Sequence, residues 1–183
     1  MSELAPKPKP TISVPTPDDA EGYRHVQARG WLDAYPNDTA GVSRKWVEDL
    51  TDAWFTPEAL DDSRARVASM LADDKCRFLY VAKVGDECVG MTYATNIDDN
   101  QRIEALYVDK PYYGTGLAQQ LMETALGNLD LSQPIWLETI TYNRRAQQFY
   151  QKYGFEIVEG SDHMYREIMP AIKMVRPGGS REI

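Results

Sequence analysis

The chain has 183 residues, a length typical of one domain, and 43% of them are hydrophobic, which is enough for a buried core. Its 28 acidic residues outnumber its 20 basic residues and give a net charge of −8, which argues against binding to nucleic acid or anionic membranes and favours a cationic substrate. No apolar run approaches the roughly 20 residues that span a bilayer, and the N-terminus lacks a signal-peptide hydrophobic region, so we expect a cytoplasmic protein.

The first part of the chain predicts a tail followed by helices. Residues 1–10 are rich in proline and are expected to form a flexible tail, with Thr11 to Val14 as a candidate edge strand. The helices predicted next cover Asp18 to Ala34, Val42 to Trp54, and Pro57 to Ala72. The third of these helices has Thr56 as its expected N-cap.

The rest of the chain alternates between strand and helix patterns. A hairpin is predicted from Phe78 to Thr95 around Gly85-Asp86-Glu87, followed by a polar loop over Asn96 to Gln101. The later elements are a strand over Ile103 to Asp109, a helix over Gly116 to Leu129, a strand over Ile135 to Thr141, a helix over Arg144 to Tyr153 that Gly154 closes, and strands over Phe155 to Val158 and His163 to Val175. This order predicts an α+β fold with a mixed, mostly antiparallel sheet in one domain over residues 11–176, before a C-terminal tail at 177–183.

The stretch from Ile103 to Met122 joins an apolar strand directly to a glycine turn and an amphipathic helix. The first N–H groups of a helix lack intrahelical partners and carry the positive end of its dipole, so Gly114 and Gly116 would let an anion approach the bare backbone. The spacing fits neither the G-x-G-x-x-G dinucleotide pattern nor the G-x-x-x-x-G-K-[ST] phosphate loop. This segment alone therefore predicts an anion site of unspecified ligand.

A second block, Asn143 to Phe155, reads N-R-R-A-Q-Q-F-Y-Q-K-Y-G-F. With the first block it resembles the GNAT superfamily of N-acetyltransferases, in which [QR]-x-x-G-x-[GA] follows L-[YF]-V and a later helix carries N-x-x-A-x-x-F-Y-x-x-x-G-F. The second pattern matches at Asn143, Ala146, Phe149, Tyr150, Gly154 and Phe155. The first departs from the family, because Tyr113 stands where Gln or Arg is usual.

The resemblance implies a GNAT-like fold with helices on both faces of the sheet and a cleft for acetyl-CoA. In that family the strands here predicted at Ile103 to Asp109 and Ile135 to Thr141 start as neighbours and splay apart. The implied acetyl-CoA-binding residues are Leu106, Tyr107, Val108, Gly114, Thr115, Gly116, Leu117, Ala118, Gln119 and Asn143. The strand backbone would pair with the pantetheine arm and the turn would hold the pyrophosphate. Asn143 could also simply cap the following helix.

Glu104 is the candidate catalytic base, because an amine must lose a proton before it attacks a thioester. Strict alternation places Glu104, Leu106 and Val108 on one face of the strand and Ile103, Ala105 and Tyr107 on the other. Partial burial on the apolar face would raise the pKa of Glu104, and the resemblance implies that a carboxylate at this position takes the amine proton, commonly through water. The alternative is a structural ion pair with Arg102 or Lys83.

Tyr150 is the candidate catalytic acid. The resemblance places the matching tyrosine against the sulfur of the cofactor, where its hydroxyl would protonate the departing thiolate. The alternative is an amphipathic tyrosine that packs its ring and presents its hydroxyl to solvent. Cys76 and Cys88 lie outside both motif blocks and are expected to be unpaired thiols, which argues against a covalent acetyl-cysteine route.

These observations predict an N-acetyltransferase that moves the acetyl group of acetyl-CoA to a primary amine by direct attack in a ternary complex. The amine could belong to a small molecule, a polyamine or a protein. The altered residue Tyr113 motivates an alternative, a non-catalytic acyl-CoA-binding regulatory or partner module. No metal site is predicted, because His25 and His163 have no ligand partners at suitable spacing. Exposed strand edges near His163 to Val175 leave a homodimer open as an alternative to a monomer.

Overall fold

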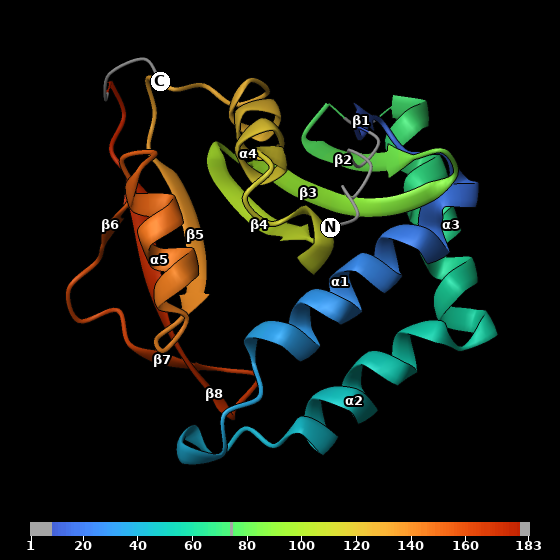
Figure 1. The fold of residues 1–183 in the computed structure, drawn as a ribbon. Helices are drawn as coiled ribbons and strands as arrows, with labels where there is room; N and C mark the ends of the chain where they lie inside the picture. Colours follow the sequence, from blue (N-terminus) through green and yellow to red (C-terminus); the bar gives the residue numbers. More distant parts are fainter. Residues whose placement is uncertain (1–8, 74, 180–183) are drawn as a thin grey trace, which may run out of the picture.

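The computed structural model describes residues 9–73 and 75–179. Its centre is a sheet in the order β1-β2-β3-β4-β5-β8-β6, with β7 also paired to β8 (Figure 1). The strands are β1 Thr11–Ser13, β2 Arg77–Val84, β3 Glu87–Ile97, β4 Asn100–Val108, β5 Ile135–Ile140, β6 Glu156–Ile157, β7 His163–Tyr165 and β8 Met169–Arg176. The pairing of β4 with β5 is parallel and every other pairing is antiparallel. The predicted mixed, mostly antiparallel sheet is confirmed.

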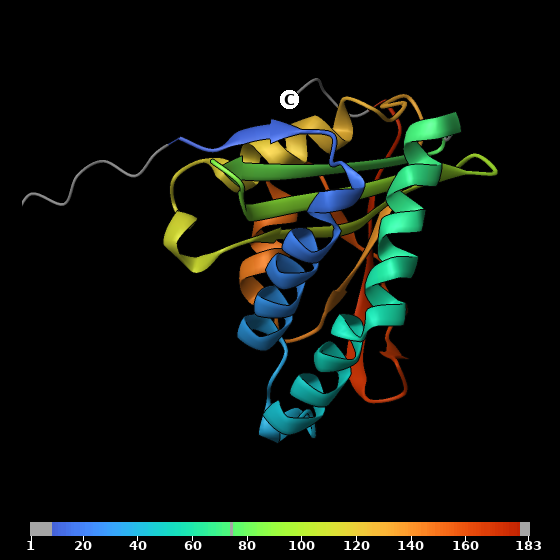
Figure 2. The same ribbon diagram turned by 90° about the vertical axis from the view of Figure 1, so that its right-hand side faces the viewer.

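Helices cover both faces of this sheet, as expected (Figures 1 and 2). They are α1 Ala20–Ala34, α2 Arg44–Asp52, α3 Pro57–Asp73, α4 Leu117–Leu126 and α5 Arg144–Gln151. One face carries α1 and α3, which bury Val26 and Val67 against Val81 and Met91 of the sheet. On the opposite face α4 packs against β2 and β3, and α5 shares a core cluster with α4.

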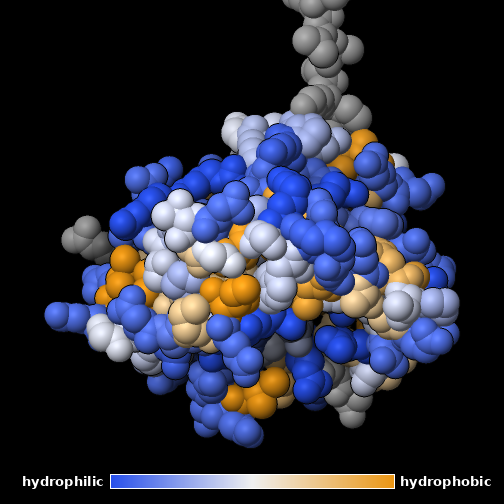
Figure 3. Space-filling view, turned by 90° about the horizontal axis from the view of Figure 1, so that it is seen from below, coloured by the Kyte–Doolittle hydropathy of each residue, from blue (hydrophilic) through white to orange (hydrophobic). Residues whose placement is uncertain are grey.

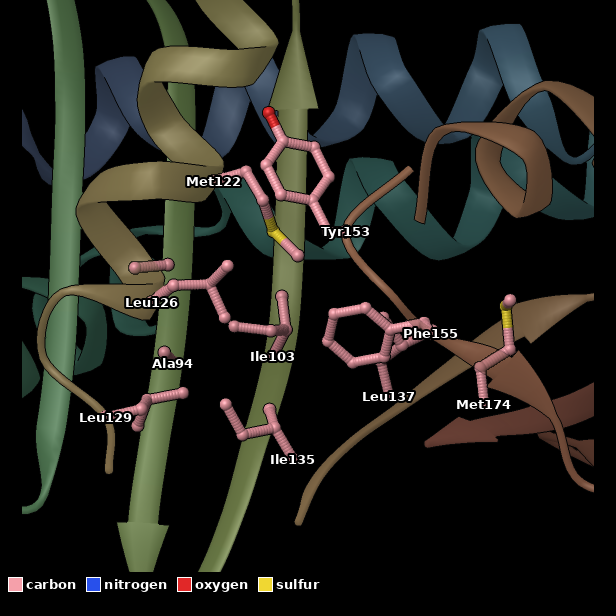
Figure 4. Packing of buried hydrophobic residues seen from close by; sticks show 11 residues of the cluster. Ala94, Ile103, Met122, Leu126, Leu129, Ile135, Leu137, Tyr153, Phe155 and Met174 are labelled. Carbon is pink, nitrogen blue, oxygen red and sulfur yellow. The ribbon is translucent and has the colours of Figure 1, made fainter. Parts of the chain in front are cut away.

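The core beneath α4 fixes the start of β4 beside the start of β5 (Figure 4). Met122 and Leu126 of α4 pack in one cluster with Ile103 of β4 and with Ile135 and Leu137 of β5. All five side chains are nearly or fully excluded from solvent, and burial of a side chain of this size contributes about 1.5–3 kcal/mol each. The two strands are therefore held together firmly at one end.

Beyond that end β4 and β5 part. Their registered pairs stop at Ile103 with Leu137, whereas β4 continues to Val108 and β5 to Ile140. From Glu104 onward, the edge of β4 that faces β5 has no strand partner within residues 9–73 and 75–179. The splayed strand pair implied by the family resemblance is thus present.

A β-bulge in β4 overturns the predicted strict alternation of its faces. Tyr93 lies opposite Ala105 but Ala94 lies opposite Ile103, so Glu104 is an extra residue in the ladder. Ile103 consequently packs on the α4 face of the sheet, together with Leu106. Ala105, which was predicted to share a face with Ile103, packs on the α1 face.

Several element boundaries also differ from expectation. The predicted polar loop over Asn96 to Gln101 is instead a two-residue turn, Asp98-Asp99, with φ values of 52° and 60°. This left-handed pair suits the twist of a tight hairpin, so both strands extend almost to the turn. The helix predicted to reach Leu129 ends at Leu126, where Gly127 follows as its C-terminal cap.

The C-terminal strand segment folds back on itself. Arg166 and Glu167 adopt left-handed φ values of 50° and 64° and divide the predicted strand into β7 and β8. Because β8 pairs with β5 on one side and with β6 and β7 on the other, it is not an exposed edge. The edge argument for a homodimer therefore does not apply to β8.

Most of the predicted tails at 1–10 and 177–183 lies outside the described residues, and β1 begins at Thr11 while β8 ends at Arg176. No helix in the described part of the chain is long and apolar enough to cross a membrane. The face in Figure 3 is mainly hydrophilic, with hydrophobic residues in separate small patches.

Candidate active site

A cavity of about 390 Å³ lies where β4 and β5 part. Its walls come from α1, β4, the glycine turn, β5, α5 and the hairpin of β7 and β8. The predicted site residues that line it are Glu104, Leu106, Tyr107, Val108, Gly114, Gly116, Ala118, Gln119, Asn143 and Tyr150. Two predicted residues do not line it. Thr115 donates its hydroxyl hydrogen to Tyr112 O at 2.7 Å, and the side chain of Leu117 is buried in the core.

The glycine turn opens α4 towards the cavity. Gly114 and Gly116 have φ values of 74° and 89°, a left-handed backbone that L side chains rarely adopt. Among the described residues, no side chain caps the start of α4, nor that of α1. By contrast, α2, α3 and α5 begin under the side-chain oxygens of Ser43, Thr56 and Asn143, which accept backbone N–H groups at 3.1–3.2 Å. The uncapped N–H groups of α4 suit an anion such as a pyrophosphate.

The unpaired edge of β4 suits an extended chain of amides. Leu106, Tyr107 and Val108 line the cavity on the part of β4 that has left β5. Unpaired strand N–H and C=O groups bind extended ligands as an added strand would. The two amides of a pantetheine arm could form hydrogen bonds with the unpaired N–H and C=O groups of this edge.

Tyr150 lies on α5 at the wall of the cavity. Its ring packs against Phe149 and Phe155, with centroid distances of 5.6 Å and 6.0 Å. Its hydroxyl makes no hydrogen bond within the described residues, and burial raises the pKa of Tyr150 above that of free tyrosine. The hydroxyl is therefore a protonated donor without a competing partner in the described part of the chain.

Glu104 lies at the bulge of β4. Its side chain is 35% exposed, accepts a hydrogen bond from Thr95 Oγ1 at 3.2 Å, and lies 3.4 Å from Arg102 Nε. The bulge turns Glu104 out of the apolar row, so its partly buried side chain lies beside the polar side chains of Thr95 and Arg102. The ion pair with Arg102, the structural alternative, is present. The same Arg102 donates to Glu138 of β5 at 3.1 Å, so it bridges the two strands where they part.

An aromatic wall closes the cavity on the α1 side. Tyr107 Oη accepts a hydrogen bond from Trp31 Nε1 at 2.8 Å and shares one with Tyr35 Oη at 3.0 Å. Gly30 makes room for this wall, since a Cβ atom there would lie 2.4 Å from Tyr107 Cδ1. The hydrogen bonds fix the orientation of all three rings.

The cysteines lie away from this chemistry. Neither is in a disulfide and neither lines the cavity. Cys88 is buried, and this burial raises the pKa of its thiol to about 11. It therefore stays protonated at neutral pH and is a poor nucleophile. The residues that the structure describes contain no group of three or more His, Cys, Asp or Glu side chains placed to hold a metal ion.

Sequence reasoning missed several lining residues. Gln27 and Gly30 of α1, Glu138 of β5 and Tyr165 of β7 all line the cavity. A glycine inside a helical pattern next to Trp31 was a usable signal for close packing. Glu138 directly follows the last paired residue of β5, as Glu104 does on β4, but this register is visible only in the structure. Tyr165 had no local signal.

Comparison with known proteins agrees with this architecture. Residues 46–176 match the family model described as the acetyltransferase (GNAT) domain. N-acetyltransferases of Mycobacterium tuberculosis and Mycobacterium bovis, both described as uncharacterised, are 35% identical over 142 residues, which is 76% of this chain and 84% of theirs.

Solved structures show the same fold. PaiA N-acetyltransferase of Thermoplasma acidophilum, determined with coenzyme A, has a TM-score of 0.66 at 18% identity, with 91% of this chain and 98% of that one covered. A GNAT acetyltransferase of Streptococcus pneumoniae has a TM-score of 0.69 at 16% identity, with 93% and 100% covered. Together with the family match, this shows that the chain belongs to the GNAT family of acetyltransferases.

Proposed function

We propose that this protein transfers the acetyl group of acetyl-CoA to a primary amine by direct attack within a ternary complex. The amine belongs to a small molecule, a polyamine or a protein. The coenzyme A in the Thermoplasma structure supports acetyl-CoA as the donor. The cavity itself supports it through the uncapped start of α4 and the unpaired edge of β4, which suit a pyrophosphate and an amide arm respectively.

The proposed reaction assigns one step to each group. Glu104 accepts a proton from the ammonium group through water, since this residue lines the cavity and its side chain is 35% exposed. The amine lone pair then attacks the thioester carbonyl carbon, and a backbone N–H of β4 donates to the oxygen that becomes negative. As the carbon–sulfur bond breaks, Tyr150 donates its hydroxyl proton to the thiolate. The products are the acetylated amine and the free CoA thiol.

One observation carries this proposal. The anion-binding helix start, the unpaired strand edge and the protonated Tyr150 hydroxyl all border the same cavity. A protein that only binds acyl-CoA would need the first two features. It would not need a tyrosine hydroxyl that lines the cavity without a hydrogen-bond partner among the described residues. The aromatic wall on the α1 side leaves that end of the cavity for the acceptor.

The test is release of the CoA thiol from acetyl-CoA in the presence of a panel of primary amines. We expect release that depends on the amine and appears together with the acetylated product. Tight CoA binding with no amine-dependent release across amines, diamines and peptide N-termini would instead favour the non-catalytic acyl-CoA-binding module.

A further inference from the structure

Two carboxylates from neighbouring strands share one arginine where the sheet opens. Glu104 of β4 and Glu138 of β5 directly follow the last registered pair of these strands, Ile103 with Leu137. Arg102 donates from Nη2 to Glu138 Oε1 at 3.1 Å, and its Nε lies 3.4 Å from Glu104 Oε1. All three charged residues line the cavity. The guanidinium group of Arg102 therefore lies between the candidate base and a second carboxylate.

Arg102 is shared unequally between the two carboxylates. Its contact with Glu138 is a hydrogen bond, whereas the Nε atom beside Glu104 is buried and makes no hydrogen bond within the described residues. Glu104 accepts its hydrogen bond from Thr95 Oγ1, a neutral group. In the described part of the chain, Arg102 is the only cation within 4 Å of Glu104. The charge of Glu104 is thus only partly compensated.

His163 of β7 holds Glu138 from the other side. Its Nε2 lies 3.3 Å from Glu138 Oε2, and its Nδ1 lies 3.0 Å from Ser161 O, so both ring nitrogens are engaged. The two oxygens of Glu138 therefore have separate partners, Arg102 and His163. The side chains of Glu138 and Arg102 are 25% and 28% exposed, so solvent screens their contact only in part. Glu138 is a fixed anchor for the guanidinium group.

We propose, on the basis of the proposed function, that Glu138 and His163 are positioning residues for Glu104. An arginine that pairs fully with a carboxylate stabilises its charged form and weakens it as a proton acceptor. By binding Arg102, Glu138 keeps the guanidinium group from closing on Glu104. His163 acts one contact further away, because it fixes the orientation of Glu138. Neither positioning residue takes the amine proton itself.

The first experiment is a double-mutant cycle that measures kcat/KM for an acetylated amine. Glu138→Gln should lower kcat/KM about tenfold, a part of the usual contribution of a general base, because Arg102 then pairs with Glu104. In an Arg102→Gln background the same change should cost less than about twofold, since no guanidinium group is left to move. Glu159→Gln is the matched control, because Glu159 is exposed and does not line the cavity. It should leave kcat/KM unchanged.

His163→Gln tests the more distant contact. It should cause a smaller loss of kcat/KM than Glu138→Gln, and this loss should also disappear in the Arg102→Gln background. His25→Gln is its control, because His25 pairs with Glu21 within α1 and does not line the cavity. Equal losses from Glu138→Gln with and without Arg102 would overturn the assignment, since Glu138 would then act on the amine directly or only support the sheet.

The second experiment needs no turnover. Denaturant unfolding of Arg102→Gln, Glu104→Gln and the double variant gives the coupling free energy between these two side chains. This coupling should be small while Glu138 is present and larger in the Glu138→Gln protein. Equal coupling in the two backgrounds would overturn the positioning role, whatever the protein acetylates. Absence of amine-dependent thiol release from the unmodified protein would instead refute the proposed function, so the two failures are distinguishable.

Discussion

Tyr150 and Glu104 occupy opposite kinds of environment in one cavity. Tyr150 is partly buried and packs against the rings of Phe149 and Phe155, and the loss of solvent raises the pKa of its hydroxyl. Glu104 stands on a bulge and keeps contact with solvent. The raised pKa keeps the phenol protonated at neutral pH, so that it can donate a hydrogen bond to the departing sulfur, while a solvent-exposed carboxylate can exchange a proton with water. The two environments fit an acid and a base respectively.

Tyr150→Phe should lower the rate of acetyl transfer about 100-fold, because a positioned proton donor typically contributes at least that much. The ring and its packing against Phe149 and Phe155 remain, so the melting temperature and CoA affinity should hardly change. Single-turnover rates measured from pH 6 to pH 9 check this. An unchanged rate across that pH range would mean that Tyr150 contributes only packing and is not the proton donor.

Glu104→Gln should lower kcat/KM for the amine about 100-fold and leave CoA affinity unchanged. The amide keeps the shape of the side chain and can still accept from Thr95 Oγ1. If Glu104 serves only to pair with Arg102, the variant will lose a little stability and keep its turnover. Parallel measurement of thermal unfolding and amine acetylation separates the two roles.

Cys88 predicts a pH dependence of stability. Its thiol pKa rises from 9.0 to about 11 in the folded protein. Between these values the unfolded chain loses the thiol proton while the folded chain keeps it, so the free energy of unfolding should fall as pH rises through this window. Below pH 9 the contribution is fully present. Denaturant titrations should show a shallower fall for Cys88→Ala, and an identical fall in both proteins would exclude Cys88 as a source.

At the scale of elements, α1 forms one wall of the cavity and also contacts the segment before the glycine turn, through Asp33 and Tyr113. It carries Trp31 and Tyr35, which bond to Tyr107 of β4, and Arg29, which makes a two-point ion pair with Asp109 at 2.6 Å and 2.8 Å. These contacts anchor the helix to the end of β4. The acceptor side of the cavity is thus built on a fixed helix.

Gly30→Ala tests this wall. In an unobstructed helix the change would stabilise the protein by about 0.5–1 kcal/mol. Here the new Cβ would lie 2.4 Å from Tyr107 Cδ1, so we expect a loss of about 1–3 kcal/mol from overpacking. The rate of amine acetylation should also fall, because the displaced Tyr107 ring lines the cavity. Denaturant unfolding measures whether the free energy of unfolding falls or rises. A more stable variant would show that the position of the Tyr107 ring does not require a glycine at residue 30.

Element types and the left-handed glycine turn before α4 could be predicted from the sequence because their signals are local. Gly114, Gly116 and the Asn143 cap depend on a few neighbouring residues. The bulge at Glu104 could not be predicted, since it depends on how β4 pairs with β3. The contact of Asp33 with Arg145 was equally hidden, because it joins residues far apart in the sequence.

At the scale of the whole molecule, the core under α4 holds β4 and β5 together at one end, and the cavity opens at the other. The glycine turn and the aromatic wall both border this opening, and the proposed function gives the first to the donor and the second to the acceptor. No step in the proposed reaction requires the protein to carry the acetyl group. Direct transfer is the central claim.

The most direct test uses acetyl-CoA labelled in its acetyl group. The protein is first mixed with the labelled donor, and an amine that it acetylates is added after a delay. The masses of the protein and of the small molecules are measured by mass spectrometry before and after this addition. Direct transfer predicts no label on the protein before the amine is added and one label per acetylated amine afterwards. Label bound covalently to the protein and then passed to the amine would contradict the account.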